Sequence, residues 1–191
     1  MGCNRRMTFS EELAAPPQVV PVTVDGTRLP SFVSVAVEDT GAQVLRFEPQ
    51  GNEPQGAASL EVTAADLAGN AQVVVLDTLM TLDFTAPAVG GATVTPALLR
   101  PGMVAVVTVD LQEPVTQPPT VYGLRDGDGA RVELSLDAAT PLRVTGSRAM
   151  QAGEDGTYTI FLGVLADLAG NKSGPHAVGT LTMDGRAPAV A

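Results

Sequence analysis

The sequence predicts an all-β protein built from two β-sandwich domains in tandem, and three observations lead to this prediction. Apolar residues make up 45% of the 191 residues, and with five Phe, two Tyr and no Trp the cores must consist mainly of Val, Leu and Ala, a bias that favours strands. The 15 Pro and 20 Gly are spread along the chain, as expected for turns between many short elements. The third observation is a repeat whose period gives each domain the common size of roughly 100 residues.

The repeat is clearest in the pentapeptide DLAGN, which begins at Asp66 and again at Asp167. The same spacing is kept downstream, where TLDFTAPAV is matched by TMDGRAPAV. It shifts by one residue upstream, where FSEELAAPPQV from Phe9 is matched by LQEPVTQPPTV from Leu111. A period this constant over three separated patches is typical of a module array in which each unit is one domain.

Seven short strands are expected in the second domain. Runs rich in Val, Thr, Leu and Ile follow one another at the spacing typical of a β-sandwich, and no helical periodicity competes with them. In chain order they are ATVTP from Ala92, VAVVTVDL from Val104, TVYGLRD from Thr120, RVELSLD from Arg131, LRVTG from Leu142, TYTIFLGVLA from Thr157 and VGTLTMD from Val178.

Each DLAGN segment follows an alternating apolar run and precedes another strand, so it is expected to form the turn of a β-hairpin. Its Asp carboxylate can accept hydrogen bonds from backbone N–H groups, and Gly and Asn tolerate positive φ. Before the second copy, Tyr158, Ile160 and Leu162 share one face of the strand. Leu165 has the opposite phase, so we expect a β-bulge near Gly163 that turns it inward.

The charge and the cysteine content exclude several classes of function. A net charge of −10 repels nucleic acid and anionic lipid, and no cluster of Lys and Arg offers a local exception. The single cysteine, Cys3, excludes an internal disulfide and a Cys-rich zinc site. The sequence has no run of about 20 apolar residues, the length that a membrane-spanning helix needs. MGCNRR fits neither a myristoylation nor a lipoprotein signal. We expect no membrane insertion, and no export signal in this stretch.

Three segments resemble bacterial immunoglobulin-like (Big-type) repeats. VTVDLQEPV is similar to the V-T-V-T-F-S-E-P-V stretch of that family, and YTIFLGVLADLAGN is similar to Y-T-V-T-V-S-G-V-T-D-L-A-G-N. LDFTAP and MDGRAP resemble the V-D-T-T-A-P linker that joins one repeat to the next, although Phe84, Gly185 and Arg186 depart from its Thr residues. The resemblance implies tandem seven-stranded Greek-key sandwiches in large, exported bacterial surface proteins, often adhesins or spacer stalks.

The alignment of the copies predicts an N-terminally truncated immunoglobulin-like domain over 1–84, a complete one over 85–185 and the start of a linker to a further repeat over 186–191. MTFSEEL corresponds to the end of the second strand, so we expect the first domain to lack its first strand and most of the next. The open sheet edge that results should make this domain less stable and prone to associate.

In such a sandwich the loop between the last two strands lies at the end where the chain enters, beside the loop after the second strand. Asp83, Glu113 and Asp167 are therefore expected to crowd one corner at the junction of the domains, with Asn171 nearby. These hard oxygen ligands could hold Ca²⁺, the one cofactor we consider, and stiffen the joint. The alternative is that Asp167 caps its own turn, Glu113 is solvated and Asp83 ends a strand.

Two other candidates favour structural roles. His176, the only histidine, is expected in a surface loop before the last strand, since no Cys or G-x-S-x-G context accompanies it. Asp126 and Asp128 in RDGDGARVEL alternate as in a calcium loop, but the spacing fails the EF-hand pattern, and Asp-Gly chemistry predicts a hairpin turn.

We therefore expect a non-enzymatic structural or spacer module, extracellular or on a bacterial cell surface and possibly within an adhesin. Its partners would be neighbouring repeats of the same chain and a surface protein or glycan. An alternative is an accessory module that binds or positions carbohydrate beside an exported hydrolase, although two Tyr and no Trp provide few stacking platforms. A ligand-specific adhesin tip is a third hypothesis, but the complete module lacks the long insertions that tips carry.

Overall fold

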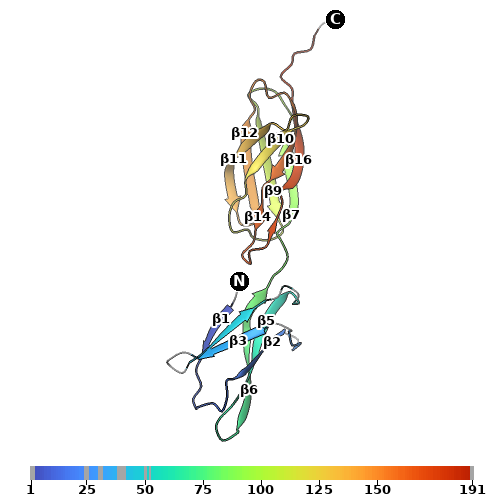
Figure 1. Ribbon diagram of the computed structural model, residues 1–191. Coiled ribbons are helices and arrows are strands. Elements are labelled where there is room, and N and C mark those ends of the chain that lie inside the picture. Colours follow the sequence, from blue (N-terminus) through green and yellow to red (C-terminus); the bar gives the residue numbers. More distant parts are fainter. Residues whose placement is uncertain are drawn as a thin grey trace. The chain divides into compact units, whose positions relative to one another are not determined.

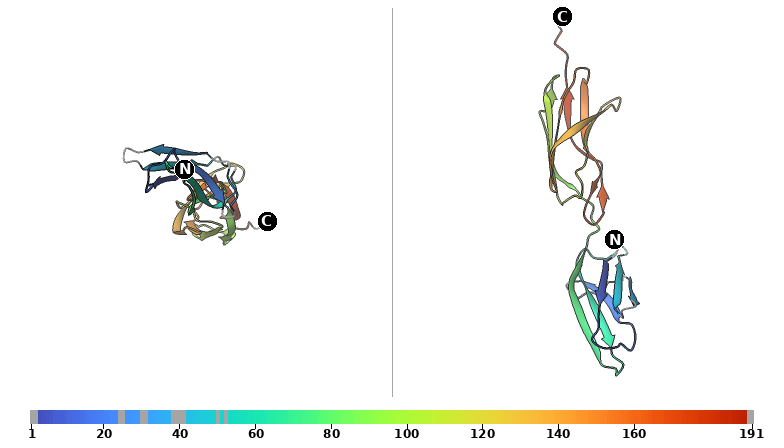
Figure 2. Two further views of the ribbon diagram at one scale, coloured as in Figure 1. Left: turned by 90° about the horizontal axis from the view of Figure 1, so that it is seen from below. Right: turned by 90° about the vertical axis from the view of Figure 1, so that its left-hand side faces the viewer.

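The computed structural model describes residues 3–23, 26–29, 32–37, 42–49, 51 and 53–189. The chain divides into two compact units, Met1–Phe84 and Thr85–Ala191, each of which is described by itself. Every regular element in the described ranges is a strand, so the predicted all-β class is confirmed (Figure 1; Figure 2 gives two further views). In the same ranges no helix is long and apolar enough to cross a membrane.

The second unit is a two-layer β-sandwich that contains all seven predicted strands. One layer has the order β7-β9-β12-β11, and the other continues as β11-β10-β13-β16-β8. Its strands are β7 (Val89–Thr95), β8 (Leu98–Leu99), β9 (Val104–Leu111), β10 (Val121–Arg125), β11 (Arg131–Thr140), β12 (Arg143–Ala149), β13 (Gly156–Leu162), β14 (Leu165–Ala166), β15 (Lys172–Ser173) and β16 (His176–Met183).

Strand β11 belongs to both layers. Its first half pairs with β10 up to Leu134, opposite Val121, and its second half pairs with β12 from Ser135 onward. The register of the β11–β12 ladder shifts between Leu136 and Ala138. The strand thus passes from one layer to the other, which is how sandwiches with bent strands form their corners.

The two-residue strand β8 was not predicted from the sequence. It pairs parallel with the end of β16, with Leu98 opposite Thr182 and Leu99 opposite Met183. The Thr182 amide donates to the carbonyl oxygen of Ala97 at 2.7 Å, and the Asp184 amide donates to that of Leu99 at 2.9 Å. The first and last parts of the unit are therefore joined directly by backbone hydrogen bonds.

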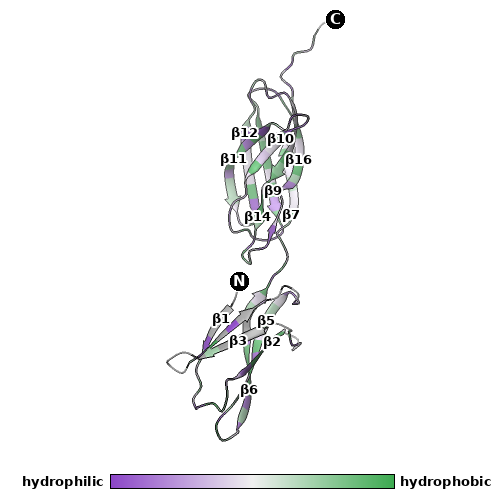
Figure 3. Cartoon of the chain, in the orientation of Figure 1, coloured by the Kyte–Doolittle hydropathy of each residue, from purple (hydrophilic) through white to green (hydrophobic). Residues whose placement is uncertain are grey.

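The core of the second unit follows from the alternation along its strands. In β9 every second side chain is buried, and Val107 and Val109 are fully so. Apolar and polar stretches alternate along the strands when the chain is coloured by hydropathy (Figure 3). Each fully buried side chain of this kind stabilises the fold by roughly 1.5–3 kcal/mol. The buried cluster is Leu99, Ala105, Val107, Val109, Leu111, Val115, Val121, Leu134, Val144, Met150, Tyr158, Ile160, Leu162, Leu165, Leu181 and Met183.

The predicted bulge at Gly163 is wrong, although the inward turn that it was meant to explain is present. Strand β13 ends at Leu162, two residues outside any strand follow, and β14 begins at the fully buried Leu165. A Cβ atom at Gly163 would lie 2.4 Å from Oγ1 of Thr120, so any side chain at this break would force Thr120 to shift. The register shift between β13 and β16 lies nearer the middle of β13, after Ile160.

The first unit repeats the arrangement with fewer described strands. Its two three-stranded sheets have the orders β1-β4-β3 and β2-β5-β6. Leu29, Ala58 and Leu82 form a buried cluster, against which Met80 and Phe84 pack. The strands are β1 (Cys3–Met7), β2 (Gln18–Thr23), β3 (Phe32–Val37), β4 (Gln43–Glu48), β5 (Gly56–Ala65) and β6 (Ala71–Leu82).

The pairing of β1 corrects one expectation. β1 pairs with β4 over five residues, as β9 pairs with β12 in the second unit. By the repeat spacing, Cys3–Met7 corresponds to 105–109, so most of the strand that we expected to be missing is present. The prediction failed because the segment CNRR carries no apolar alternation. In the described part of the unit, β1 is an edge strand with no partner on its outer side.

Candidate functional site

The second DLAGN segment is a closed hairpin turn between β14 and β15, as predicted. Oδ1 of Asp167 accepts hydrogen bonds from the amides of Gly170 at 2.6 Å and Asn171 at 2.9 Å. Oδ2 accepts a third from Nδ2 of Asn171 at 2.9 Å. Gly170 has a φ of 95°, a conformation that glycine adopts without steric cost. The Asp side chain therefore caps its own turn.

The first DLAGN segment forms a similar turn in a more exposed place. Asp66 accepts from the amides of Ala68 and Asn70, both at 2.9 Å, and from Nδ2 of Asn70 at 2.8 Å. Gly69 again has a positive φ, of 87°. The turn is thus encoded by the pentapeptide itself, because its Asp accepts from the backbone and side chain of its Asn in two units with different surroundings.

Both aspartates have lowered pKa values, although only Asp167 is deeply buried. The hydrogen bonds from the Asn70 side chain and backbone hold the pKa of Asp66 below its ordinary value. Asp167 is only 4% exposed, and this burial acts to raise its pKa. The hydrogen bonds from Asn171 and Gly170 together outweigh the effect of burial, so the pKa of Asp167 is also lowered. Both carboxylates are therefore charged at neutral pH.

Three of the four predicted calcium ligands come together within the second unit. A carboxylate oxygen of Glu113 lies within 4.8 Å of one of Asp167, and Asn171 bonds to Asp167 directly. The loop that carries Glu113 is held there because the amide of Thr116 donates to the carbonyl oxygen of Ala166 at 2.8 Å. The described residues at this corner thus bring together two carboxylates, as expected.

The capacity of Asp167 for a metal is limited. A carboxylate offers about four lone-pair positions, and three of those of Asp167 already accept hydrogen bonds. Oδ2, with one bond, keeps room for a cation. Asp83, the fourth predicted ligand, is half-buried directly after β6 in the first unit. Whether it joins the others stays a prediction.

The RDGDG segment forms the predicted hairpin turn between β10 and β11. Both carboxylate oxygens of Asp128 bond to the guanidinium of Arg125, with 3.0 Å between Nε and Oδ1, and Oδ1 also accepts from the amide of Ala130 at 3.0 Å. These contacts, with that of Arg125 first in effect, lower the pKa of Asp128 to about 2. Asp128 thus closes the turn and neutralises Arg125.

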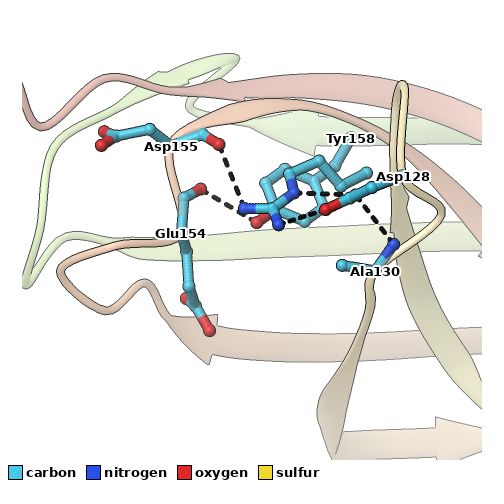
Figure 4. A network of polar contacts seen from close by, with 6 residues as sticks. Asp128, Ala130, Glu154, Asp155 and Tyr158 are labelled. Carbon is cyan, nitrogen blue, oxygen red and sulfur yellow. Dashed lines mark hydrogen bonds and ion pairs between the residues drawn. The ribbon is translucent and has the colours of Figure 1, made fainter.

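Arg125 links this turn to the start of β13, in a network that the sequence did not predict (Figure 4). Its Nη1 donates to the carbonyl oxygen of Asp155 at 3.4 Å. Beside it the Tyr158 hydroxyl donates to the carbonyl oxygen of Glu154 at 2.9 Å. Tyr158 is 1% exposed, and burial raises the pKa of its phenol. The contact between these two distant segments left no local pattern in the sequence, but the tyrosine near the start of β13 could have indicated it.

The chain leaving the last strand is held by the same region. Oδ1 of Asp155 accepts from the amide of Gly185 at 2.5 Å, and a Cβ atom at Gly185 would lie 2.9 Å from that oxygen. In the first unit, Oε1 of Gln55 accepts from the amide of Phe84 at 3.4 Å, at the matching place in the repeat. Gly185 in MDGRAP, where the family linker has Thr, is therefore explained by the close approach of Asp155.

The structure places His176 elsewhere than expected. His176 is the half-buried first residue of β16 rather than part of a loop. Its Nε2 lies 3.0 Å from Oγ of Ser173, whose hydroxyl bonds to the carbonyl oxygen of Pro87. Since the hydroxyl proton points to that carbonyl, the imidazole donates to the serine oxygen. This geometry holds a loop together and does not activate Ser173 as a nucleophile.

One aromatic pair lies on the outer face of β10 and β13. The rings of Tyr122 and Phe161 are stacked with centroids 5.6 Å apart. The guanidinium carbon of Arg131 lies 3.7 Å from the centroid of Tyr122, which is only 9% exposed. The tyrosine face is covered, so it offers little surface on which a sugar could stack.

A buried tyrosine whose hydroxyl bonds to the backbone four residues upstream, at the start of the strand before the last hairpin, is the tyrosine corner of immunoglobulin-like sandwiches. The fold is immunoglobulin-like. The two layers that share β11 and the Greek-key order of the strands agree with this assignment.

No protein-family model and no curated protein matches the sequence. Among solved structures, a tetra-tandem repeat from the extending region of a large adhesion protein is 17% identical, with a TM-score of 0.40 over 93% of this chain and 45% of the other. A Ca²⁺-stabilized adhesin of an ice-binding Antarctic bacterium is 17% identical, with a TM-score of 0.48 over 98% and 45%. A titin structure of three immunoglobulin domains is 12% identical, with a TM-score of 0.39 over 97% and 60%. The chain spans less than two thirds of each.

Proposed function

We propose that this chain is a non-enzymatic, tension-transmitting segment of a tandem-repeat surface protein of a bacterium, and that its units are bacterial immunoglobulin-like repeats acting as a spacer, as in an adhesin stalk. Three polar clusters of the described residues support this proposal, because they close turns or hold a loop in place. Asp167 caps a turn, Asp128 neutralises Arg125, and Ser173 and His176 fasten a loop.

The observation that carries the proposal is the parallel pairing of β8 with β16. β8 lies near the N-terminal end of the second unit, and β16 ends it. When the two ends of the unit are pulled apart, parallel strands are drawn in opposite directions, so their hydrogen bonds are loaded in shear and must break together. An antiparallel pair at the same place would open one bond at a time. The arrangement suits a module that transmits tension.

The test is single-molecule stretching of the chain between its ends, with a matched pair of variants. Asp184→Pro removes the amide that donates to Leu99, whereas Asp184→Ala keeps it. Both variants lose the side-chain hydrogen bond to the amide of Arg186. We expect Asp184→Pro to lower the unfolding force of the second unit and Asp184→Ala to leave it near that of the unmodified chain. Equal forces for the two variants would contradict the proposal.

We further propose that Ca²⁺ binds at the junction through Asp83, Glu113 and Asp167, with Asn171 beside them. Carboxylate and carbonyl oxygens are the ligands that Ca²⁺ prefers, and it takes 6–8 of them, so backbone oxygens and water would complete the site. The proximity of Glu113 to Asp167 supports this proposal, because two carboxylate oxygens within 4.8 Å of one another can bind the same cation. Such a site would restrict bending between repeats.

A further inference from the structure

The loop between β1 and β2 passes from one sheet of the first unit to the other and forms most of the wall of a hollow of about 520 Å³. This volume lies within the range of roughly 300–1,000 Å³ that is usual for ligand sites. We refer to it as the β1–β2 hollow. Its wall contains the apolar residues Phe9, Leu13 and Pro16, the acidic residues Glu11 and Glu12, and the amide of Gln43.

Gln43 is the unusual member of this wall. It pairs with Met7 at the first position of β4, as Val144 pairs with Val109 in the second unit. Gln43 is 8% exposed and Val144 is fully buried, so both occupy a core position. Within the described ranges, Oε1 of Gln43 is buried and accepts no hydrogen bond. A buried carbonyl oxygen without a donor destabilises the fold, and departures of this kind from good packing are expected at functional sites.

The hollow is open because of its side chains. By the repeat spacing, Phe9 and Leu13 correspond to Leu111 and Val115, which are buried in the core of the second unit. Phe9 and Leu13 are only half-buried, and Gln43 stands where the second unit has a valine. The hollow reaches from the β1–β2 loop to β4, whereas β7 of the second unit pairs with the side of β9 that faces away from β12. A strand paired with the free side of β1 would therefore not fill the hollow.

The polar groups of the hollow favour a cation that also donates hydrogen bonds. Glu11 and Glu12 carry exposed carboxylates, and neither forms an ion pair in the part of the chain that the structure describes. The amide oxygen of Gln43 lacks a donor. Because the chain has a net charge of −10, its field also attracts basic partners. A bare metal ion would leave the apolar part of the wall uncovered, so the cation should carry an apolar stem.

An arginine side chain meets these requirements. Its alkyl stem can cover apolar surface, its guanidinium stays charged when partly buried, and five N–H groups allow it to bond a carboxylate and an amide oxygen at once. We propose that the β1–β2 hollow binds an arginine side chain of a partner protein. The guanidinium would pair with Glu11 and Glu12 and donate to Oε1 of Gln43, and the stem would pack against Phe9 and Leu13. The first unit would then bind a partner in addition to acting as a spacer.

NMR titration of the full chain with a blocked Ala-Arg-Ala tripeptide tests the proposal. The control is the same peptide with citrulline in place of arginine, which keeps the length and the planar head group but lacks the charge. We expect the arginine peptide to shift the side-chain amide signals of Gln43 and the backbone amide signals of Glu12 and Leu13 until they saturate. The citrulline peptide should bind at least about tenfold more weakly, because charge-assisted hydrogen bonds to the carboxylates are lost.

Matched variants locate the site. Gln43→Val introduces the residue that the second unit has at this position, so it should make the first unit more resistant to urea while weakening peptide binding about tenfold. Glu12→Gln removes one charge from the wall and should weaken binding by a similar factor. Asp137→Asn makes the same kind of change at an exposed carboxylate of the second unit and should leave binding unchanged.

Four results would overturn the proposal. The first is that no signal of the hollow shifts at the highest soluble concentration of the arginine peptide, and the second is that the citrulline peptide binds equally well. The third is equal binding of a lysine tripeptide, which would show that the hollow accepts any basic side chain. The fourth is binding of ethylguanidinium without binding of the arginine tripeptide, since the ligand would then be a free small molecule and not a protein side chain.

Discussion

Replacing Tyr158 by Phe should destabilise the second unit measurably while leaving its shape intact. The substitution removes only the hydroxyl, which donates to the carbonyl oxygen of Glu154 at 2.9 Å, and keeps the ring in the core. Removing one partner of a buried hydrogen bond costs about 1–3 kcal/mol. Glu154 is half-buried, so water can partly replace the lost donor and we expect about 1.5 kcal/mol. For a domain of this size that corresponds to roughly 5–10 °C in Tm.

The assay uses the distribution of tyrosines. Tyr122 and Tyr158 both belong to the second unit, and the chain has no Trp, so tyrosine fluorescence in urea reports the unfolding of this unit alone. Tyr122→Phe is the matched control. It makes the same chemical change on the outer face, where the ring is held by Phe161 and Arg131. The reasoning is refuted if Tyr158→Phe lowers the free energy of unfolding no more than Tyr122→Phe does.

Leu165, Asp128 and Asp167 each give a further prediction. Leu165→Ala, at a fully buried side chain, should cost about 3 kcal/mol in urea unfolding, whereas Leu168→Ala, 78% exposed, should change little; similar losses would show that Leu165 is not packed in the core. Because the pKa of Asp128 is lowered from 3.8 to about 2, the stability that its charge provides is fully present above pH 3.8 and lost as the pH falls toward 2. Asp128→Asn should therefore flatten the fall in the free energy of unfolding over that range, and an unchanged pH profile would contradict this. Asp167→Ala should lower the Tm in chelator, because the turn cap is lost, and should lower it by more in calcium. Asp66→Ala should lower the Tm equally in both conditions. If Asp167→Ala also lowers it equally, Asp167 is not a calcium ligand.

The strands of the second unit could be predicted because each carries its own alternation. The run from Val104, for example, buries every second residue as its sequence requires. β8 could not, since Leu98 and Leu99 form a strand only through pairing with the distant end of β16. β1 was missed for a related reason. Its residues CNRR have no apolar pattern, and the strand is defined by its partner β4.

In the candidate site, too, local contacts could be predicted from the sequence and most distant ones could not. The DLAGN turns could be predicted because Asp, Gly and Asn act on neighbouring backbone. The approach of Glu113 to Asp167 was expected from the order of loops in a sandwich. The contacts of Arg125 with Asp155 were not, because they join segments 30 residues apart. From the sequence, Gly185 was only a position at which MDGRAP differs from the V-D-T-T-A-P linker. The position of the Asp155 carboxylate explains why glycine is found there.

The most direct test of the proposed mechanical role is to stretch a single chain by its ends and compare the two units within one molecule. At roughly 3.5 Å per residue, extending 3–82 releases about 28 nm and extending 89–183 about 33 nm, so the two events can be told apart. The account predicts that the longer event, from the unit with the β8–β16 pair, occurs at the higher force. If the longer event comes at the same or the lower force, the parallel pair does not bear the load and the proposed function is wrong.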